Sequence, residues 1–300
     1  QMVWPSPWHP RSFPGWHAEC SAMSIEHLGP QIDIHTGGID HIAVHHANEI
    51  EQSETYTEKR PFVKYWVHHN FLRVDGEKMS KSLGNFYTID DIIKKGFSPQ
   101  ALRLLFLMSH YRSEQNFTWD SLAAAQKAYL KLARFVLDLR NSKRNSELEL
   151  SDFPGAVQLH HDFFDAIEND LKTNEALTVL WELMQSDLDS DVLYRLVMEF
   201  DQVLGLGLAG LTEESLLEAV KKALAKTIID QDFAQKMGVQ ENLLQLSDLP
   251  DSIQELIKKR QLARRDQDFT EADRLRAELK EQGYELLDLA DGQLAIRKIK

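Results

Sequence analysis

The sequence has 300 residues, of which 43% are apolar, and a formal net charge of -13. This length can bury a core and form about two domains, and the acidic balance argues against non-specific nucleic-acid binding by the whole chain. No apolar run approaches the roughly 20 residues of a membrane helix, and the first residues lack a signal-peptide pattern. The single cysteine, Cys20, excludes an intrachain disulfide and predicts a reducing, cytoplasmic setting.

Charge and histidine are unevenly distributed along the chain. Residues 251–300 contain 11 Lys and Arg and 11 Asp and Glu, so the first 250 residues carry the whole net charge. The tail is therefore one place to look for a local basic surface. Seven of the twelve histidines fall within the first 50 residues, as does Cys20.

The first third of the chain predicts alternating helix and strand. Residues 20–28 predict a helix that Gly29 and Pro30 end, and residues 31–38 alternate as a strand does. A Gly-Gly turn then opens toward a helix at residues 45–56. This succession of helix, strand, turn and helix is typical of an α/β nucleotide-binding sheet.

From Phe117 onward the pattern is helical and predicts a bundle. Residues 173–185 and 190–208 show the same helical pattern. Loops are expected at residues 141–154 and 238–250. A charged tail helix is expected to break near Asp268, and residues 284–299 suggest a hairpin. One predicted helix stripe consists of apolar residues spaced by three and four, namely Leu122, Ala125, Tyr129, Leu132, Val136 and Leu139.

The stretch HHANEIEQSE, residues 45–54, is a candidate metal site. On a helix His45 and Glu49 project from one face, whereas His46 points about 100° away and is not expected to bind the same ion. A nitrogen and a carboxylate ligand suit zinc, and Cys20 lies at a predicted helix start, where a thiolate is favoured. Taken alone, a solvated His–Glu pair is the commoner explanation, and a closed zinc site needs four ligands.

The second candidate is GEKMSKSLGN, residues 76–85. Lys78 and Lys81 could place ammonium groups on phosphate oxygens, and the flanking glycines would let the loop close over a ligand. A solvated turn is the alternative for an ordinary loop of this composition.

Several stretches resemble the cysteinyl-tRNA synthetase family of class I aminoacyl-tRNA synthetases. KMSKS is the signature loop of that class, GWHAECSAM resembles the family's GWHIECSAM, and DIHTGGIDHIAVHHANEIEQSE resembles its HGGxDL…HHxNExAQSE block. ALRLLFLMSHYRSEQNFTWDSL and FFDAIENDLKTNEALTVL are similar to its stem-contact and anticodon-binding regions. The resemblance covers nearly all 300 residues and is weakest in the tail.

The resemblance implies roles for individual residues. One zinc ion would bind the substrate thiol, with Cys20, His45 and Glu49 as its ligands in this sequence. Lys78 and Lys81 match the mobile loop lysines, and Lys81 is expected to contact the phosphates of ATP, which enters with Mg. Trp16 and His35 match residues of the pocket beside the amino acid. Gly37, Gly38 and Asp40 match a turn that approaches the adenosine and ribose. Thr36 stands where the family usually has a third glycine. For Trp16, a plain core aromatic is the alternative.

The implied reaction activates cysteine with ATP to cysteinyl adenylate and then transfers the aminoacyl group to tRNA(Cys). Two family features are absent from the 300 residues: the His-x-Gly-His motif, and the cysteine that would be the fourth zinc ligand. We therefore expect a truncated chain that is inactive alone, with exposed apolar surface that favours association. A full-length protein would be a monomer.

The expected fold is α/β plus α. Residues 1–60 would form the second half of a Rossmann-type class I catalytic domain with the zinc site. Residues 61–115 would hold the KMSKS loop and the stem-contact region. Residues 116–240 would form an anticodon-binding helical bundle and residues 250–300 a small α+β tRNA-binding tail. Basic tail residues available to the RNA backbone are Lys258, Lys259, Arg260, Arg264, Arg265, Arg274 and Arg276.

Three alternatives remain open at this point. A ligase that joins cysteine to an amino sugar shares the zinc-dependent catalytic domain but should lack the anticodon-binding tail. A non-catalytic tRNA-binding fragment would keep the helical part and lose cysteine activation. A zinc hydrolase is the weakest, because no general base is paired with the candidate ligands as in HExxH.

Overall fold

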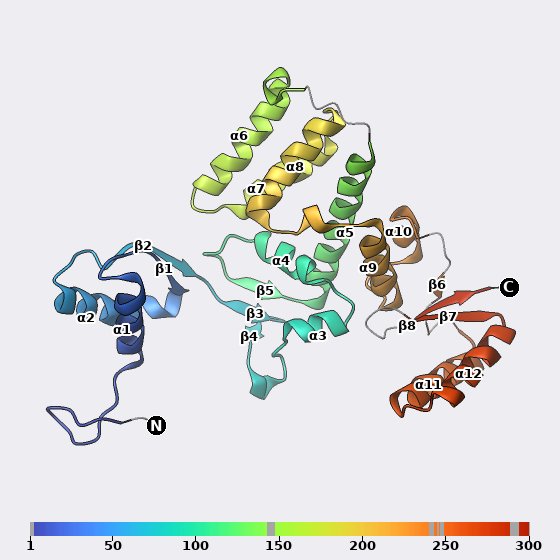
Figure 1. The fold of residues 1–300 in the computed structure, drawn as a ribbon, viewed down its shortest axis with the longest axis horizontal. Coiled ribbons are helices and arrows are strands. Elements are labelled where there is room, and N and C mark those ends of the chain that lie inside the picture. The colour runs from blue at the N-terminus through green and yellow to red at the C-terminus, as the bar shows by residue number, and fades with distance from the viewer. Residues whose placement is uncertain are drawn as a thin grey trace. The chain divides into compact units, whose positions relative to one another are not determined.

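The computed structural model describes residues 3–142, 148–239, 243–244, 246, 249–288 and 294–299. The chain divides into two compact units, residues 1–78 with 110–116 and residues 79–109 with 117–300. Figure 1 shows the helices and strands of both. Among the described residues, no helix is both long and apolar enough to cross a membrane. The predicted boundaries at residues 60, 115 and 240 stay predictions.

The first unit is built around a β-α-β arrangement. Strands β1 (Ile32–Gly38) and β2 (Val63–His69) are parallel, and helix α2 (Ala47–Thr57) connects them in the chain (Figure 1). Helix α1 (Trp16–Leu28) packs against α2. It ends at Gly29, whose φ of 95° lies in the region that favours glycine. The predicted succession of helix, strand and helix is confirmed, although α1 begins four residues earlier than expected.

The β1–β2 pair buries one face and exposes the other. Ile32 and Val63 are paired and pack with Phe62 in a small core. Ile34 and Tyr65 are also paired, but they are 62% and 68% exposed. The prediction of exposed apolar surface in this part of the chain is therefore confirmed, and association through it stays a prediction.

A small three-stranded sheet leads to the lysine loop. Its strands β3 (Leu72–Val74), β4 (Glu77–Lys78) and β5 (Gln115–Phe117) lie in the order β4-β3-β5. Asp75 and Gly76 form the turn between β3 and β4 with φ values of 51° and 80°, as a two-residue Asp-Gly hairpin turn requires. Lys78 is thereby fixed on a strand and not on a free loop.

The second unit is mainly helical. A 3-10 turn (Leu150–Asp152) lies within the loop predicted at residues 141–154, of which residues 143–147 lie outside the described part. The loop predicted at 238–250 contains the short strand β6 (Leu243–Leu244) and is described only in part. The main helices of the second unit are α3 (Ile89–Lys94), α4 (Pro99–Leu107), α5 (Trp119–Asn141), α6 (Pro154–Glu168), α7 (Thr173–Gln185), α8 (Ser190–Leu204), α9 (Glu213–Ala225) and α10 (Gln231–Lys236).

Helix α5 is the central element of the bundle and packs against α4, α8 and α9. Thr118 begins it with a capping box, because its hydroxyl accepts from the Ser121 backbone N–H. All six residues of the predicted apolar stripe are buried, which confirms both the helix and the face it presents. On the neighbouring helices, Phe163 of α6 and Phe200 of α8 stack with ring centroids 3.8 Å apart.

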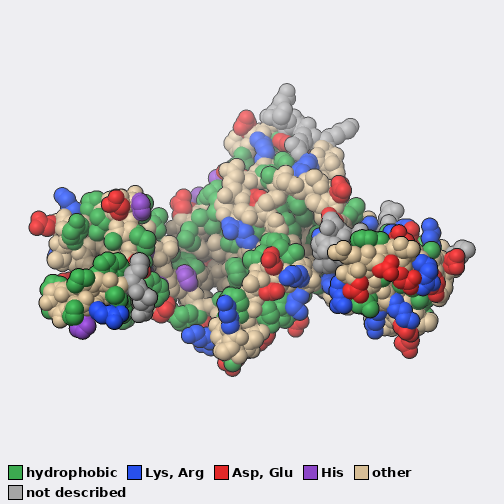
Figure 2. Space-filling view, turned by 60° about the horizontal axis from the view of Figure 1, so that its bottom comes forward, with side chains coloured by type: hydrophobic (Ala, Val, Ile, Leu, Met, Phe, Trp, Pro, Cys, Tyr) green, Lys and Arg blue, Asp and Glu red, His purple; other side chains and the backbone are tan. Residues whose placement is uncertain are grey.

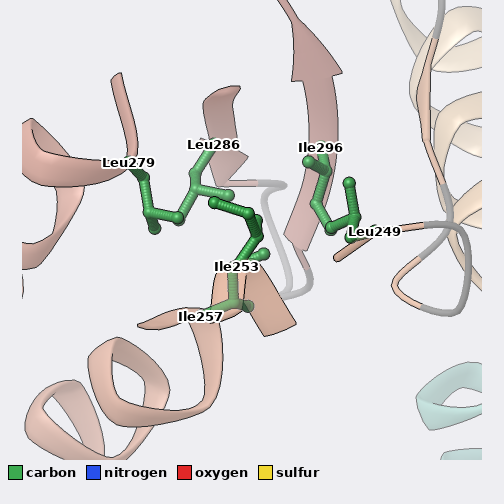
Figure 3. Close-up of a cluster of buried hydrophobic side chains, with 6 residues drawn as sticks. All are labelled: Leu249, Ile253, Ile257, Leu279, Leu286 and Ile296. Atoms are coloured by element: carbon green, nitrogen blue, oxygen red, sulfur yellow. The ribbon is translucent and has the colours of Figure 1, made fainter. Parts of the chain in front are cut away.

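The tail forms a separate small core. Helices α11 (Asp251–Arg265) and α12 (Phe269–Glu281) pack on the antiparallel strands β7 (Tyr284–Asp288) and β8 (Leu294–Lys298). Asp268 caps α12, which confirms the predicted break, and the hairpin is confirmed although its turn, residues 289–293, lies outside the described residues. Figure 3 shows the buried side chains that hold this core together, namely Leu249, Ile253, Ile257, Leu279, Leu286 and Ile296.

Candidate active site

Three predicted metal ligands converge in the first unit. Cys20 projects from α1, His45 lies in a π-helical turn (Ile42–His46), and Glu49 lies in the first turn of α2. Their ligand atoms all lie within 4.8 Å of one another. The proximity of His45 and Glu49 that helical spacing predicts is therefore present, and Cys20, which the resemblance implied, lies beside them; their binding of a metal stays a prediction.

The Glu49 carboxylate provides the strongest physical indication of a cation. Its side chain is fully buried, and its polar contacts are with the side chains of three residues, His35, His45 and Cys20. Oε1 lies 3.5 Å from His45 Nε2, and Oε2 lies 2.8 Å from His35 Nε2. A buried carboxylate is costly unless positive charge compensates it. Sulfur, nitrogen and oxygen donors are a set that zinc accepts, so these residues fit zinc.

The environment of Cys20 differs from the prediction. Because α1 begins at Trp16, Cys20 lies in the second turn and not at the helix start. Burial, followed by the negative charge of Glu49, raises the pKa of the Cys20 thiol above its usual value. The prediction of a thiolate favoured by the helix start is therefore wrong. A cation at this position would offset the charge of Glu49, so metal binding should release the thiol proton.

Trp16 and His35 lie beside these ligands. The Trp16 ring meets the His45 ring edge-on, with centroids 4.9 Å apart, and the Trp16 side chain is 65% exposed. Trp16 is therefore not part of the core of the described residues, and its role beside the amino acid stays a prediction. His35 reaches Glu49 from β1, and Trp66, its partner on β2, stacks on the His35 ring.

His46 lies outside the Cys20 group. It is buried, its Nδ1 lies 2.8 Å from His68 Nε2, and it clusters with His35 and Glu49 instead of with Cys20 and His45. The prediction that it does not bind the same ion as His45 therefore stays a prediction, whereas its burial was not predicted. The contribution of His68, in the strand VKYWVHH, was not predicted.

We expect the metal-free protein to lose stability as the pH falls from about 6.5 to 4. Burial is the largest of the effects that lower the pKa of His46 to about 4, and burial also lowers the pKa of His68. The folded state therefore binds fewer protons than the unfolded chain in this window, and folding is opposed by up to about 3 kcal/mol at His46. Urea unfolding of chelator-treated protein at pH 7 and pH 4.5 measures this loss, and His46→Gln should reduce it. An unchanged difference in the variant would contradict the assignment.

Gly37 and Gly38 end strand β1 and pair with His68 and His69 of β2, so the predicted Gly-Gly turn is wrong at these two residues. A Cβ on Gly37 would lie 2.4 Å from Cε1 of the His46 ring, and one on Gly38 would lie 2.4 Å from Asp40 Oδ1. The backbone therefore passes directly against the histidine cluster and the Asp40 carboxylate. The role of these residues toward adenosine stays a prediction.

The KMSKS residues have a defined local structure. Lys78 lies opposite Arg73 in the β3–β4 hairpin. In the second unit Lys81 begins a 3-10 turn (Lys81–Leu83), which the Ser80 side chain caps and Gly84 ends with a φ of 68°. The Ser80 N–H donates to Asn85 Oδ1 at 2.8 Å, and Lys81 Nζ lies 5.4 Å from the centre of the Phe86 ring. Lys81 is exposed to solvent and can reach an anionic ligand.

The tail carries less free positive charge than its sequence suggests. Figure 2 shows acidic and basic side chains mixed over this part of the surface. Arg260 is buried, so its predicted availability to RNA is wrong. Arg274 pairs with Glu271 and Glu278. Arg276 donates to the Leu286 carbonyl, Lys259 pairs with Glu255, and Arg265 pairs with Asp266. The basic side chains on α11 that are exposed to solvent are Lys258, Lys259, Arg264 and Arg265.

Comparisons with known proteins identify the family of the chain. Residues 1–127 match the family model of the "tRNA synthetases class I (C) catalytic domain", and residues 246–293 match the "Cysteinyl-tRNA ligase anticodon binding domain". A cysteine–tRNA ligase 1 of Burkholderia lata is 38% identical over 98% of this chain and 53% of its own length. Cysteine–tRNA ligases of Chlamydia felis and Caldicellulosiruptor saccharolyticus are 36% and 37% identical over 97% of this chain and over 56% and 58% of their lengths.

The matched catalytic and anticodon-binding domains define a class I aminoacyl-tRNA synthetase. Within that class, the chain belongs to the cysteinyl-tRNA synthetase family. It spans about half the length of the curated relatives it matches.

Proposed function

We propose that this chain is the cysteine-recognising and tRNA-binding part of a cysteine–tRNA ligase. The substrates would be cysteine, ATP with Mg and tRNA(Cys). The observation that carries the proposal is the convergence of Cys20 and His45 on the fully buried carboxylate of Glu49. The names of the relatives and the two matching family models support the same assignment.

Cys20, His45 and Glu49 would hold one zinc ion. When bound, zinc would supply a thiophilic Lewis acid that distinguishes the cysteine thiol from the hydroxyl of serine, which a pocket separates poorly by shape. The 300 residues contain no second cysteine, so a fourth position remains for a further ligand.

Residues around this group would position the substrates. Trp16, edge-on to His45 and exposed, would form one wall for the amino acid, and His35 would line the pocket from β1. The Gly37–Gly38 backbone and Asp40 would approach adenosine and ribose, since glycine permits close contact and a carboxylate accepts from hydroxyls. Lys78 and Lys81 would stabilise charge on the ATP phosphates, with Lys81 as the direct contact.

The tail bears on the choice between tRNA and an amino sugar as the acceptor of cysteine. An amino-sugar ligase should lack an anticodon-binding region, whereas residues 246–293 match the model of that domain. The described tail has its own core and exposed basic residues on α11. Both observations support tRNA as the acceptor.

Cysteine-dependent exchange between ATP and pyrophosphate tests whether these 300 residues suffice for activation. We expect no exchange, because the 300 residues contain neither a His-x-Gly-His motif nor a second cysteine. We also expect the zinc-loaded chain to bind cysteine more tightly than serine in equilibrium dialysis, and Cys20→Ser to reduce that preference. Robust exchange would refute the requirement for further residues, and equal binding of both amino acids would refute the proposed zinc role.

A further inference from the structure

We propose that four lysines of the second unit form a binding site for consecutive phosphate groups, namely Lys94, Lys95, Lys127 and Lys226. They line a hollow of about 730 Å³ that is open to solvent, and Asp120 is the one acidic residue among those that line it. The ligand would be a chain of phosphates, either the backbone of an RNA strand or a free polyphosphate. The inference does not depend on zinc or on cysteine activation, since every lining residue belongs to the second compact unit.

The four lysines come from three parts of the chain. Lys94 ends α3 and Lys95 follows it, Lys127 lies in the third turn of α5, and Lys226 follows the last residue of α9. The chain as a whole has a net charge of -13, so this local excess of positive charge runs against its average. Because like charges repel one another, gathering them around one hollow costs free energy unless an anion binds there.

Carboxylates of the protein do not neutralise this group. Within the described part of the chain, none of the four lysines forms an ion pair, and Asp120 forms none either. Asp91, three residues before Lys94 on α3, accepts instead from the backbone N–H and the hydroxyl of Thr88, at 2.9 and 2.7 Å. The four ammonium groups can therefore bind an anionic ligand without first breaking an ion pair.

Neighbouring groups hold two of the lysine side chains. Lys95 Nζ lies 4.6 Å from the centre of the Trp119 ring, a cation–π contact at the wall of the hollow. The stem of Lys226 lies against Gly96, where an added Cβ would be 2.7 Å from Lys226 Cγ and would displace it. Both side chains are therefore partly ordered before a ligand binds, which lowers the entropy cost of binding.

Thr227 provides an independent indication of a ligand. Its φ of 61° lies in the left-handed region, and among the described residues it is the one β-branched residue there. It follows α9 at the position where helices commonly end with glycine, and the Ile228 N–H donates to the Ala223 carbonyl at 2.9 Å. A threonine costs more than a glycine at this position, but it brings to the wall of the hollow a hydroxyl that can donate to a phosphate oxygen.

Calorimetric titration of the metal-free chain with inorganic tripolyphosphate tests the site, and filter binding of a tRNA(Cys) transcript tests RNA as the source of the phosphates. Lys127→Gln combined with Lys226→Gln should weaken tripolyphosphate binding by at least about tenfold. If RNA is the ligand, the slope of log affinity against log salt concentration should also fall by about 2, since two phosphate contacts are lost. Lys127→Arg combined with Lys226→Arg keeps both charges and should bind as the wild type does.

Lys172→Gln combined with Lys236→Gln is the matched control. It removes the same charge from two lysines outside the hollow, which pair with Glu175 and Asp232, and it should leave the affinity for both probes unchanged. Urea unfolding without ligand separates binding from a structural role. Removing two mutually repelling charges at the hollow should leave the free energy of unfolding unchanged or higher, whereas a structural role would lower it.

Three results would overturn the proposal. They are a wild type that does not bind tripolyphosphate, glutamine variants of the hollow that bind both probes as tightly as the control, and equal wild-type affinity for tripolyphosphate and a tetra-aspartate peptide. Loss of affinity for both probes would support the site with RNA as the ligand, and loss for tripolyphosphate alone would support a free polyphosphate. A wild type that binds tripolyphosphate but no tRNA would contradict the proposed function and leave this site standing.

Discussion

Replacing Glu49 with glutamine should lower zinc affinity by at least about 100-fold and at the same time stabilise the metal-free protein. The carboxylate is the one anionic oxygen ligand of the Cys20 group, and outer-shell changes alone can cost about 10- to 100-fold. Without metal, however, this carboxylate is a fully buried charge that contacts only the side chains of His35, His45 and Cys20 among the described polar groups. Removing that charge should add about 1–3 kcal/mol to the free energy of unfolding.

Competition with a chromophoric chelator measures the affinity, and urea unfolding with chelator present measures the stability. The matched control is Glu51→Gln, an exposed residue on the same helix, which should change neither quantity appreciably. If Glu49→Gln destabilised the metal-free protein, the contact of the carboxylate with His35 would outweigh the cost of burying its charge. Unchanged zinc affinity would remove Glu49 from the site.

Phe200→Ala should destabilise the helical unit by about 3–5 kcal/mol without altering metal binding. The Phe200 side chain is fully buried and stacks on Phe163 of α6, so truncation leaves a cavity between two helices. Metal binding belongs to the other compact unit, so zinc affinity should stay at the wild-type value.

Unfolding in urea, followed by the helical circular dichroism signal, gives the stability change. Val203→Ala on the same helix is the control, because Val203 is 40% exposed and its truncation should cost only about 0.5 kcal/mol. A loss of about 1 kcal/mol or less in Phe200→Ala would show that the bundle can close around the cavity.

Much of the fold could be predicted from short-range patterns. The stripe from Leu122 to Leu139 defined α5 because one face of a helix must be apolar to pack. Gly29 and Asp268 marked helix boundaries through local backbone and capping chemistry. The start of α1 was missed because Gly15, before Trp16, offers no side-chain cap that a sequence pattern would reveal.

The site could be predicted only where ligands share regular geometry. His45 and Glu49 follow from helical spacing, but the burial of His46 beside His35 has no sequence signal of its own. Its contact with His68 joins residues 22 positions apart and requires the parallel sheet. Similarly, nothing in the charged sequence around Arg260 predicted that this arginine faces the tail core.

X-ray absorption at the zinc edge tests the central claim most directly, using protein loaded with one equivalent of zinc. The proposed site predicts one sulfur neighbour, from Cys20, in the absence of amino acid. Adding cysteine should introduce a second sulfur neighbour, and adding serine should leave the spectrum unchanged. A zinc ion with no sulfur neighbour, or one whose sulfur coordination does not change with cysteine, would contradict thiol recognition at Cys20, His45 and Glu49.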